Sequence, residues 1–152
     1  MKIRIEISEQ NDDEIVIRCR QKTDKISAIE TAIENALKSR GELVLYIGST
    51  EYYVQKSEIL FFEASGGKVF AHTRDGMFTA QYKLFELEDV MPSSFTRISK
   101  SVIANINLIS SLRRELTGNG EIAFKGSDKK TYFSRAYYKI LKDKIEEVRF
   151  GI

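Results

Sequence analysis

From residue 43 to residue 133 the chain is a succession of short β-type segments divided by turns. The segments are rich in β-branched and aromatic residues, which favour strands. They cover residues 43–47, 52–56, 59–63, 68–73, 77–81, 106–115, 121–125 and 130–133. Glycine turns separate several of them, and Asp75-Gly76 predicts a two-residue hairpin connection. Because short connections join antiparallel neighbours, this pattern predicts mostly antiparallel sheets.

Helical patterns follow and interrupt the strands. A last helix is predicted from Arg135 to about Val148, with Ser134 as its N-cap. Its buried face should contain the following residues: Tyr137, Ile140, Leu141, Ile145 and Val148. A shorter helix is predicted over residues 83–90, before Pro92. The expected fold class is therefore mostly β with α, ending in a C-terminal helix.

The first 42 residues have a different pattern, which predicts a small β-β-α unit. Residues 2–7 and 15–20 alternate aliphatic with polar side chains, as half-buried strands do, and Cys19 is expected in the core. From Asp24 to Ser39 the apolar residues recur at helical spacing. They are Ile26, Ile29, Ile33 and Leu37.

Such a unit buries too little surface to be stable alone. Its helix should therefore either pack on the two strands and the rest of the chain or serve in dimerisation. We divide the chain into a dimerisation or regulatory unit, residues 1–42, and a second domain, residues 43–152.

The positive charge of the chain is concentrated in one third of its length. The net charge is +2, but residues 95–144 contain 11 basic and 4 acidic side chains, a local excess of +7. This asymmetry is expected of a nucleic-acid-binding surface. A basic face can also bind an acidic protein, so a protein-interaction module is the alternative.

Enzyme chemistry finds no support in the sequence. One histidine and one cysteine are too few soft ligands for a zinc site, and no glycine-rich nucleotide motif or nucleophile elbow is present. His72 lies on a predicted strand and fits a structural role. A hydrolase that uses His72 is therefore the weakest of the three hypotheses for the function. We expect no catalytic residue, metal, cofactor or small-molecule substrate. The lone cysteine and the absence of a membrane-span pattern or signal peptide favour a cytoplasmic location.

The segment from Phe95 to Asn107 joins a polar, basic first half to an aliphatic second half. Its polar part includes Arg97, Ser99, Lys100 and Ser101. An apolar anchor can present such a loop rigidly outward, as contact with phosphates or bases requires. We expect a DNA-contacting loop here, although Arg97 equally fits an ion pair with a carboxylate.

Two other places carry candidate DNA contacts. In the turn at Gly67 and Lys68, the glycine lets the backbone approach a phosphate and the lysine adds positive charge. At the start of the last helix, free amides favour a phosphate and Arg135 can reach a guanine edge. Lys139 extends a basic stripe on the same helix. Each has a simpler explanation, as an ordinary hairpin turn or as a solvated cation.

Three ordered motifs resemble the LytTR family of bacterial DNA-binding domains. Residues 58–63, Glu-Ile-Leu-Phe-Phe-Glu, match the family pattern Asp/Glu-Ile-x-Tyr/Phe-Phe/Ile-Glu. Residues 95–105 match Phe-x-Arg-Ile-His-x-Ser-x-Ile-Val-Asn, except that Ser99 replaces the histidine. Residues 132–135, Tyr-Phe-Ser-Arg, match the start of the family's last helix. The resemblance covers residues from about 43 to 145.

This resemblance implies elongated antiparallel β-sheets that bind DNA through loops rather than through a recognition helix. Carried over residue by residue, the contacts come from Lys68, from Lys100 with Ser99 and Ser101, and from Arg135. The outer loops would enter successive major grooves and the middle loop the minor groove between them. Because Ser99 replaces the common histidine and Lys100 follows it, the middle loop should make more phosphate contact and less base readout than most members of the family.

The resemblance also implies how the protein is controlled. Residues 1–42 are too short for a receiver domain, so no activating phosphorylation site is expected. The short N-terminal unit is similar to that of stand-alone LytTR regulators, often encoded beside a membrane protein that inhibits them. We expect a sequence-specific transcriptional regulator that binds paired repeats in double-stranded DNA as a homodimer. Dimerisation or sequestration through residues 1–42, by a membrane-protein inhibitor, would control it.

Overall fold

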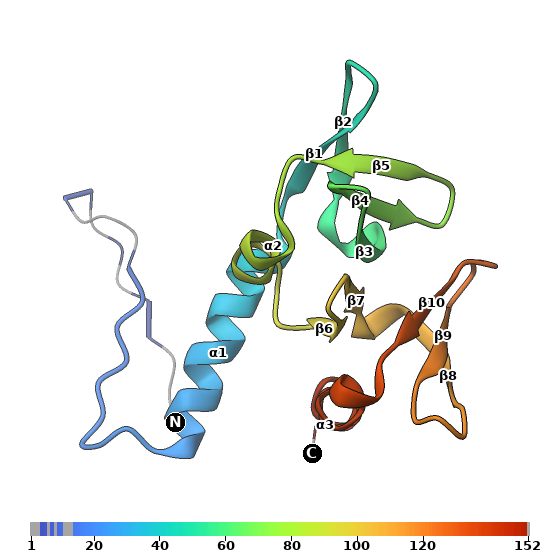
Figure 1. Cartoon of the computed structure of the whole chain (residues 1–152). Helices are drawn as coiled ribbons and strands as arrows, with labels where there is room; N and C mark the ends of the chain where they lie inside the picture. Colours follow the sequence, from blue (N-terminus) through green and yellow to red (C-terminus); the bar gives the residue numbers. More distant parts are fainter. Residues whose placement is uncertain (1–3, 6, 8, 11–13, 152) are drawn as a thin grey trace.

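The computed structural model of the chain describes residues 4, 5, 7, 9, 10 and 14–151. The larger of two antiparallel sheets contains β1 (Glu42–Ile47), β2 (Thr50–Gln55), β3 (Ile59–Ser65), β4 (Lys68–Thr73), β5 (Met77–Ala80), β6 (Phe95–Ser99) and β7 (Val102–Asn105). The smaller sheet contains β8 (Ile109–Arg114), β9 (Gly120–Phe124) and β10 (Lys130–Phe133), and the helices are α1 (Asp24–Ser39), α2 (Leu84–Val90) and α3 (Tyr138–Phe150). The predicted fold class, mostly antiparallel β with a C-terminal helix, is confirmed (Figure 1).

The strand order makes β3 the central element. The larger sheet runs β2-β1-β5-β4-β3-β7-β6 and the smaller sheet β10-β9-β8. The first four residues of β3, Ile59 to Phe62, are at most 3% exposed. A register irregularity between Ile59 and Phe61 opposite β4 breaks the usual alternation. Consequently Leu60 and Phe61 join one core, while Ile59 and Phe62 join the other.

Two hydrophobic cores lie on the two sides of β3. The α2 core packs Leu84 and Leu87 of α2 against the larger sheet. The inter-sheet core packs Phe133 of the smaller sheet and Leu141 of α3 against Ile98 of β6. Each fully buried aliphatic or aromatic side chain contributes about 1.5–3 kcal/mol relative to exposure. The two cores therefore hold α2, both sheets and α3 together.

Polar side chains join the two sheets at one end. Arg74, after β4, donates from Nε to the carbonyl of Lys125, at 3.0 Å. Lys129, before β10, donates from Nζ to the carbonyl of Gly76, at 2.5 Å. Both bonds link the β4–β5 connection to the β9–β10 connection. The hairpin predicted at Asp75-Gly76 is confirmed, but the connection between β4 and β5 spans three residues, 74–76, rather than the two predicted.

The predicted N-terminal unit is only partly correct. Residues 14–19 are exposed and outside any strand, so the strand predicted at 15–20 is wrong. Cys19 is exposed rather than buried. Of the strand predicted at 2–7, residues 4, 5 and 7 are exposed and not in a strand, and the others lie outside the described residues. The alternating pattern fails here because no described sheet edge lies beside it to cover the apolar face.

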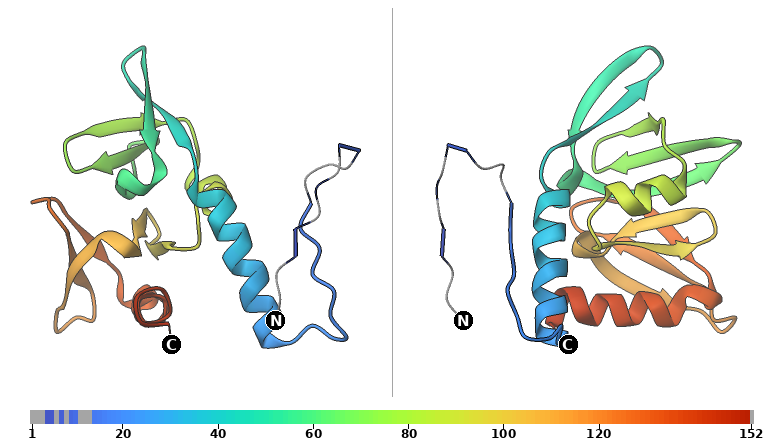
Figure 2. Two further views of the ribbon diagram at one scale, coloured as in Figure 1. Left: turned by 180° about the vertical axis from the view of Figure 1, so that it is seen from behind. Right: turned by 90° about the vertical axis from the view of Figure 1, so that its left-hand side faces the viewer.

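Helix α1 forms where the sequence predicts it but buries none of its residues completely. Thr23 caps it, accepting a hydrogen bond from the amide of Ile26 at 3.3 Å. Asn35 donates to Ser93 Oγ at 2.7 Å and accepts from the Ser93 amide at 2.9 Å. Lys56 donates from Nζ to the Lys38 carbonyl, at 2.9 Å. Polar contacts thus attach α1 beside the domain (Figure 2).

Residues 95–105 form the β6–β7 hairpin rather than a long loop. Phe95 and Thr96 are buried within β6, and residues 106–108 form a 3-10 turn rather than the start of a strand. The exposed tip is confined to Lys100 and Ser101, between β6 and β7. The loop is shorter than predicted because threonine, a β-branched residue, favours a paired strand.

The last helix also begins later than predicted. Arg135–Tyr137 form a 3-10 turn, and α3 starts at Tyr138. The Ser134 side chain makes no capping hydrogen bond. Leu141 is buried as predicted, but Ile140 is 55% exposed, and Tyr138 stacks on Phe133. The 3-10 turn rotates the helix relative to a helix started at Arg135, which changes the buried face.

Asn105 is a buried polar residue that fixes β7 to β3. Its amide group donates to the Ile59 carbonyl at 2.9 Å, and its side-chain oxygen accepts from the Asn107 amide at 3.1 Å. Asn105→Ala leaves both partners unsatisfied and should lower the free energy of unfolding by about 1–3 kcal/mol. Urea denaturation measures the change. The control is Asn107→Ala at an exposed position, and equal losses in both variants would contradict the assignment.

Candidate nucleic-acid interface

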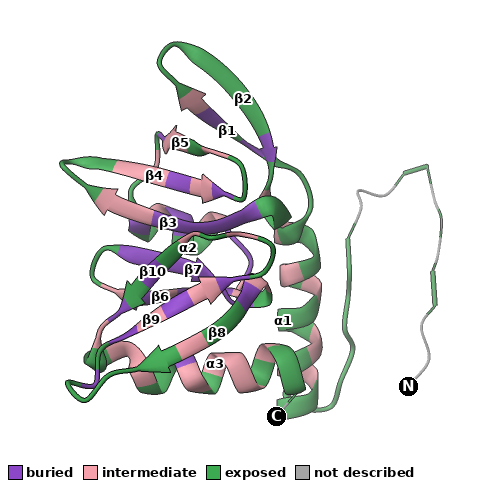
Figure 3. Ribbon diagram, turned by 90° about the vertical axis from the view of Figure 1, so that its right-hand side faces the viewer, coloured by how far each residue is buried: buried purple, intermediate pink, exposed green. Residues whose placement is uncertain are grey.

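The ends of the β3–β4 and β6–β7 hairpins and the start of α3 lie along one side of the molecule (Figures 2 and 3). Backbone hydrogen bonds hold them together. The Ala64 amide donates to the Ser101 carbonyl at 2.8 Å, which joins the first two hairpins. The Ser134 amide donates to the Ile98 carbonyl at 3.0 Å, which joins the α3 start to β6. We call this side the basic edge and define it by Lys68, Lys100 and Arg135.

The β3–β4 turn places Lys68 at the first end of the basic edge. Gly66 and Gly67 have φ angles of +59° and +77°, in the left-handed region that glycine favours. No atom lies within 4 Å of a Cβ added at either glycine, so the turn is open to an approaching ligand. Lys68 is exposed and follows directly.

The β6–β7 turn forms the middle of the basic edge. Lys100 and Ser101 are exposed and Ser99 is half-buried, with its hydroxyl accepting from the Ser101 amide at 3.3 Å. Arg97 is engaged within the protein: Nε lies 3.2 Å from a Glu88 carboxylate oxygen, and Nη1 donates to the Lys100 carbonyl at 3.0 Å. Arg97 therefore braces this turn, and part of its charge is compensated.

Arg135 stands at the far end of the basic edge. Its side chain is exposed, but its amide is not free, because it donates to Asn119 Oδ1 at 2.8 Å. The Arg135 amide itself is therefore not available to a phosphate. Lys139 is exposed one turn further along, in α3.

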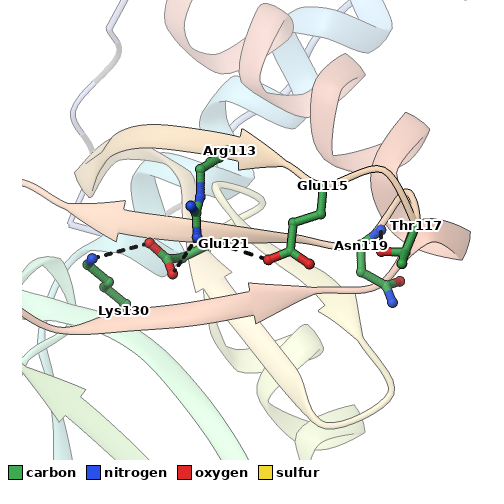
Figure 4. A network of polar contacts seen from close by, with 6 residues as sticks. All are labelled: Arg113, Glu115, Thr117, Asn119, Glu121 and Lys130. Atoms are coloured by element: carbon green, nitrogen blue, oxygen red, sulfur yellow. Dashed lines mark hydrogen bonds and ion pairs between the residues drawn. The ribbon is translucent and has the colours of Figure 1, made fainter.

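The described side chains of Lys68, Lys100 and Arg135 make no ion pair or hydrogen bond with other described residues. Much of the remaining positive charge of residues 95–144 is compensated or used inside the domain. Glu121 lies 3.4 Å from Arg113 and 3.3 Å from Lys130 in the network of Figure 4. The sequence could count these charges but could not separate the paired from the unpaired ones.

Two grooves flank the β6–β7 turn. The first has a volume of about 420 Å³ and is lined by Lys68, Lys100 and two residues that the sequence did not single out, Lys83 and Phe85. Both of these are exposed, and Lys83 Nζ lies 6.0 Å from the centre of the Phe85 ring. No motif signalled them, because only the packing of α2 beside the β3–β4 turn brings them to the edge.

The second groove has a volume of about 490 Å³ and lies between the β6–β7 turn and the α3 start. Its lining includes Ser99, Ser101, Asn119 and Ser134. The three predicted contact places therefore form one continuous surface of turn, groove, turn, groove and helix start. Such a surface can contact phosphates and base edges at several points along one face of a duplex.

His72 lies apart from this surface, between the two sheets. Its ring stacks on Phe61, with 4.2 Å between ring centres, and Phe61 stacks in turn on Phe124 of the smaller sheet. Its Nε2 atom is buried and has no hydrogen-bond partner among the described residues. Burial, with the nearby Lys129 charge, lowers the pKa of His72 from 6.5 to about 4. His72 is therefore packed as a structural ring, and no described side chain hydrogen-bonds to its buried nitrogen as a catalytic histidine would require.

Within the described residues, no group of His, Cys, Asp and Glu side chains is arranged to hold a metal ion. No helix of that part of the chain is long and apolar enough to cross a membrane.

An antiparallel β fold with a row of exposed basic turns along one side is the architecture expected of a DNA-binding domain whose contacts come from turns. The family model described as the LytTr DNA-binding domain matches residues 49–146. The chain belongs to the LytTR family of DNA-binding domains.

Relatives cover nearly the whole chain. A Staphylococcus aureus protein from strain bovine RF122 / ET3-1, described as an uncharacterized HTH-type transcriptional regulator, is 32% identical over 146 residues, 95% of this chain and 98% of the relative. A counterpart from strain NCTC 8325 / PS 47 has the same description and is 31% identical over the same length.

A solved LytTr DNA-binding domain from Bacillus cereus has the same fold. Its TM-score is 0.65 at 20% sequence identity, and the match covers 70% of this chain and 97% of that one. In the described part of the present chain, strands separate α1, α2 and α3 from one another. No two of them are consecutive, as the two helices of a helix-turn-helix would be.

The buried imidazole should make stability depend on pH. The native state keeps His72 neutral down to a pKa of about 4, whereas the unfolded chain binds a proton below about 6.5. Stability should therefore fall as the pH drops from about 6.5 to about 4, and be unaffected by this group above 6.5. His72→Phe keeps a stacked ring but cannot bind a proton, so the part of the pH dependence that comes from His72 should disappear. Urea unfolding at pH 7 and pH 4.5 tests it, and the same pH dependence in both proteins would refute it.

Proposed function

We propose that this protein is a sequence-specific transcriptional regulator that binds paired repeats in double-stranded DNA through its basic edge. The observation that carries the proposal is that the β3–β4 turn, the β6–β7 turn and the start of α3 lie along one side (Figure 3). Their cations, Lys68, Lys100 and Arg135, are exposed and have no ion-pair partner among the described residues. Unpaired cations release condensed counterions when they meet phosphates, which supplies much of the affinity. Membership of a DNA-binding family supports the same conclusion.

The contacts divide into positioning and reading roles. Lys68, Lys83 and Lys100 are suited to phosphates, because a lysine ammonium group is a mobile point charge. The Arg135 guanidinium can bind the O6 and N7 atoms of a guanine together. Ser99 and Ser101 can donate to phosphates or bases at the middle turn. In this arrangement Arg97 and Lys139 contribute to the local potential, and Arg97 also holds the middle turn.

Residues 1–42 are proposed to serve in homodimerisation, or in control by a membrane-protein inhibitor. Leu37 of α1 is 66% exposed, and Ile26, Ile29 and Ile33 are half-buried. A helix with an incompletely covered apolar face is suited to a second protein surface. The proposal includes a cytoplasmic location and no catalytic activity.

The alternative is that the basic edge binds an acidic protein. The groove beside Lys83, Phe85 and Lys68 is lined by cations and an exposed aromatic ring, which also suit an acidic peptide. Selection of bound sequences from random duplex DNA separates the two functions. Enrichment of a repeated motif supports the regulator, and a pool that stays random contradicts it.

Replacing single cations should affect binding in two distinguishable ways. Lys68→Ala, Lys83→Ala or Lys100→Ala should weaken binding to all duplexes and lower the salt slope by about one each. Arg135→Ala should cost about 1–3 kcal/mol on the selected sequence and relax specificity at the base pair it contacts. Fluorescence anisotropy over a salt series measures both.

The matched control is Lys125→Ala, because Lys125 is exposed at the opposite end of the sheets, where its carbonyl accepts from Arg74. Its binding and salt slope should equal those of the wild type. A loss in this variant as large as that of Lys100→Ala would argue for a general charge effect.

Removing the first 40 residues tests the role of the N-terminal unit. None of the described residues before Glu42 belongs to either core, so the sheets should remain folded. The shortened protein should lose much more affinity for a duplex with two half-sites than for one with a single half-site. Equal losses on the two duplexes would contradict dimerisation through this unit.

A further inference from the structure

We propose that Asn119 and Gly118, in the turn between β8 and β9, are positioning residues that orient Arg135 for base readout. The inference rests on the proposed function, in which Arg135 reads a base. Both residues lie in the connection between β8 and β9, and Asn119 is 16 positions before the arginine along the chain.

The first observation is a hydrogen bond to the arginine backbone. Asn119 Oδ1 accepts from the Arg135 amide at 2.8 Å. Arg135 precedes α3 by three residues and belongs to a single 3-10 turn. Two bonds within the turn also hold this backbone: the Tyr138 amide donates to the Arg135 carbonyl, and the Tyr137 amide donates to the Ser134 carbonyl. The Asn119 side chain therefore fixes the point from which the guanidinium extends.

The second observation is steric. Gly118 is buried beneath the Arg135 side chain: a Cβ added at Gly118 would lie 2.6 Å from both Cγ and Cδ of the arginine. Such a contact is closer than packed atoms allow, so the aliphatic part of Arg135 rests directly on the glycine backbone. The close approach restricts the rotamers of the arginine on that side.

The third observation is that the turn itself is braced. The Glu115 amide donates to the Asn119 carbonyl at 2.8 Å, and the Gly118 amide donates to the Glu115 carbonyl at 3.0 Å. These two backbone bonds close the turn without a side chain, and the bond from the Asn119 amide to Thr117 Oγ1 is longer, at 3.4 Å (Figure 4). A braced turn can hold Arg135 in one orientation, and a side chain held before binding loses less conformational entropy when it binds.

The experiment compares variants on a selected duplex and on copies of it with single base-pair changes. The base pair read by Arg135 is the one at which Arg135→Ala no longer discriminates. At that pair the wild-type discrimination should be about 5- to 150-fold. Asn119→Ala should lose most of it, while discrimination at other pairs and the salt slope stay as in the wild type. Asn119→Asp keeps an acceptor and should retain the discrimination, with weaker binding to every duplex.

Thr117→Ala is the matched control for Asn119→Ala. It removes a hydrogen bond from the same turn but leaves the bond to Arg135, so it should discriminate like the wild type. Thermal melting of all variants identifies any loss caused by unfolding. Asn119→Ala with wild-type discrimination, or Thr117→Ala with an equal loss, would overturn the inference.

Gly118→Ala tests the steric part. It should displace the Arg135 side chain and reduce discrimination at the same base pair. Gly48→Ala is its control, since Gly48 also has a positive φ, +60°, but no atom within 4 Å of an added Cβ. It reproduces the backbone strain without the contact and should leave discrimination unchanged. Failure of the wild type to select any sequence would remove the proposed function itself, whereas intact readout in Asn119→Ala or Gly118→Ala would remove only this inference.

Discussion

The position of β3 between β4 and β7 is the constraint on which the basic edge depends. Its first four residues are almost completely buried, so β3 supplies side chains to both cores. Pairing on both sides of β3 brings the β3–β4 and β6–β7 turns to the same end of the sheet, where the Ala64 amide bonds to the Ser101 carbonyl. The apolar cores and the polar surface are thus two consequences of one strand.

The division of the charged residues follows from the same arrangement. At one end of the two sheets, Arg74 and Lys129 bind backbone carbonyls and join the sheets. At the opposite end, Lys68 and Lys100 are left without partners among the described residues. Charges used inside the domain stabilise it, and charges left exposed are available to a polyanion. Arg97 lies between these roles, because Glu88 holds it beside the middle turn.

The sequence predicts the structure correctly where the local pattern and the tertiary contacts agree. The helix from Asp24 to Ser39, most strand positions and the glycine turn before Lys68 were predicted correctly, since spacing and backbone preference decide them. The strand predicted at residues 15–20 is absent, although these residues alternate aliphatic and polar side chains. The helix predicted from Arg135 begins three residues later, because a 3-10 turn precedes it. The sequence did not identify Lys83 and Asn119 as site residues, because each lies beside the interface only through contact with residues distant in sequence.

The sequence by itself determined the family, the antiparallel β class and the surplus of positive charge in residues 95–144, because motifs, periodicity and composition are properties of the chain order. Only the tertiary structure decided which cations remain unpaired and which residues hold them. Ion pairs and hydrogen bonds depend on distances between atoms, and packing brings Asn119 to Arg135 and Glu88 to Arg97. A contact of a few ångströms between separate strands leaves no regular spacing in the sequence.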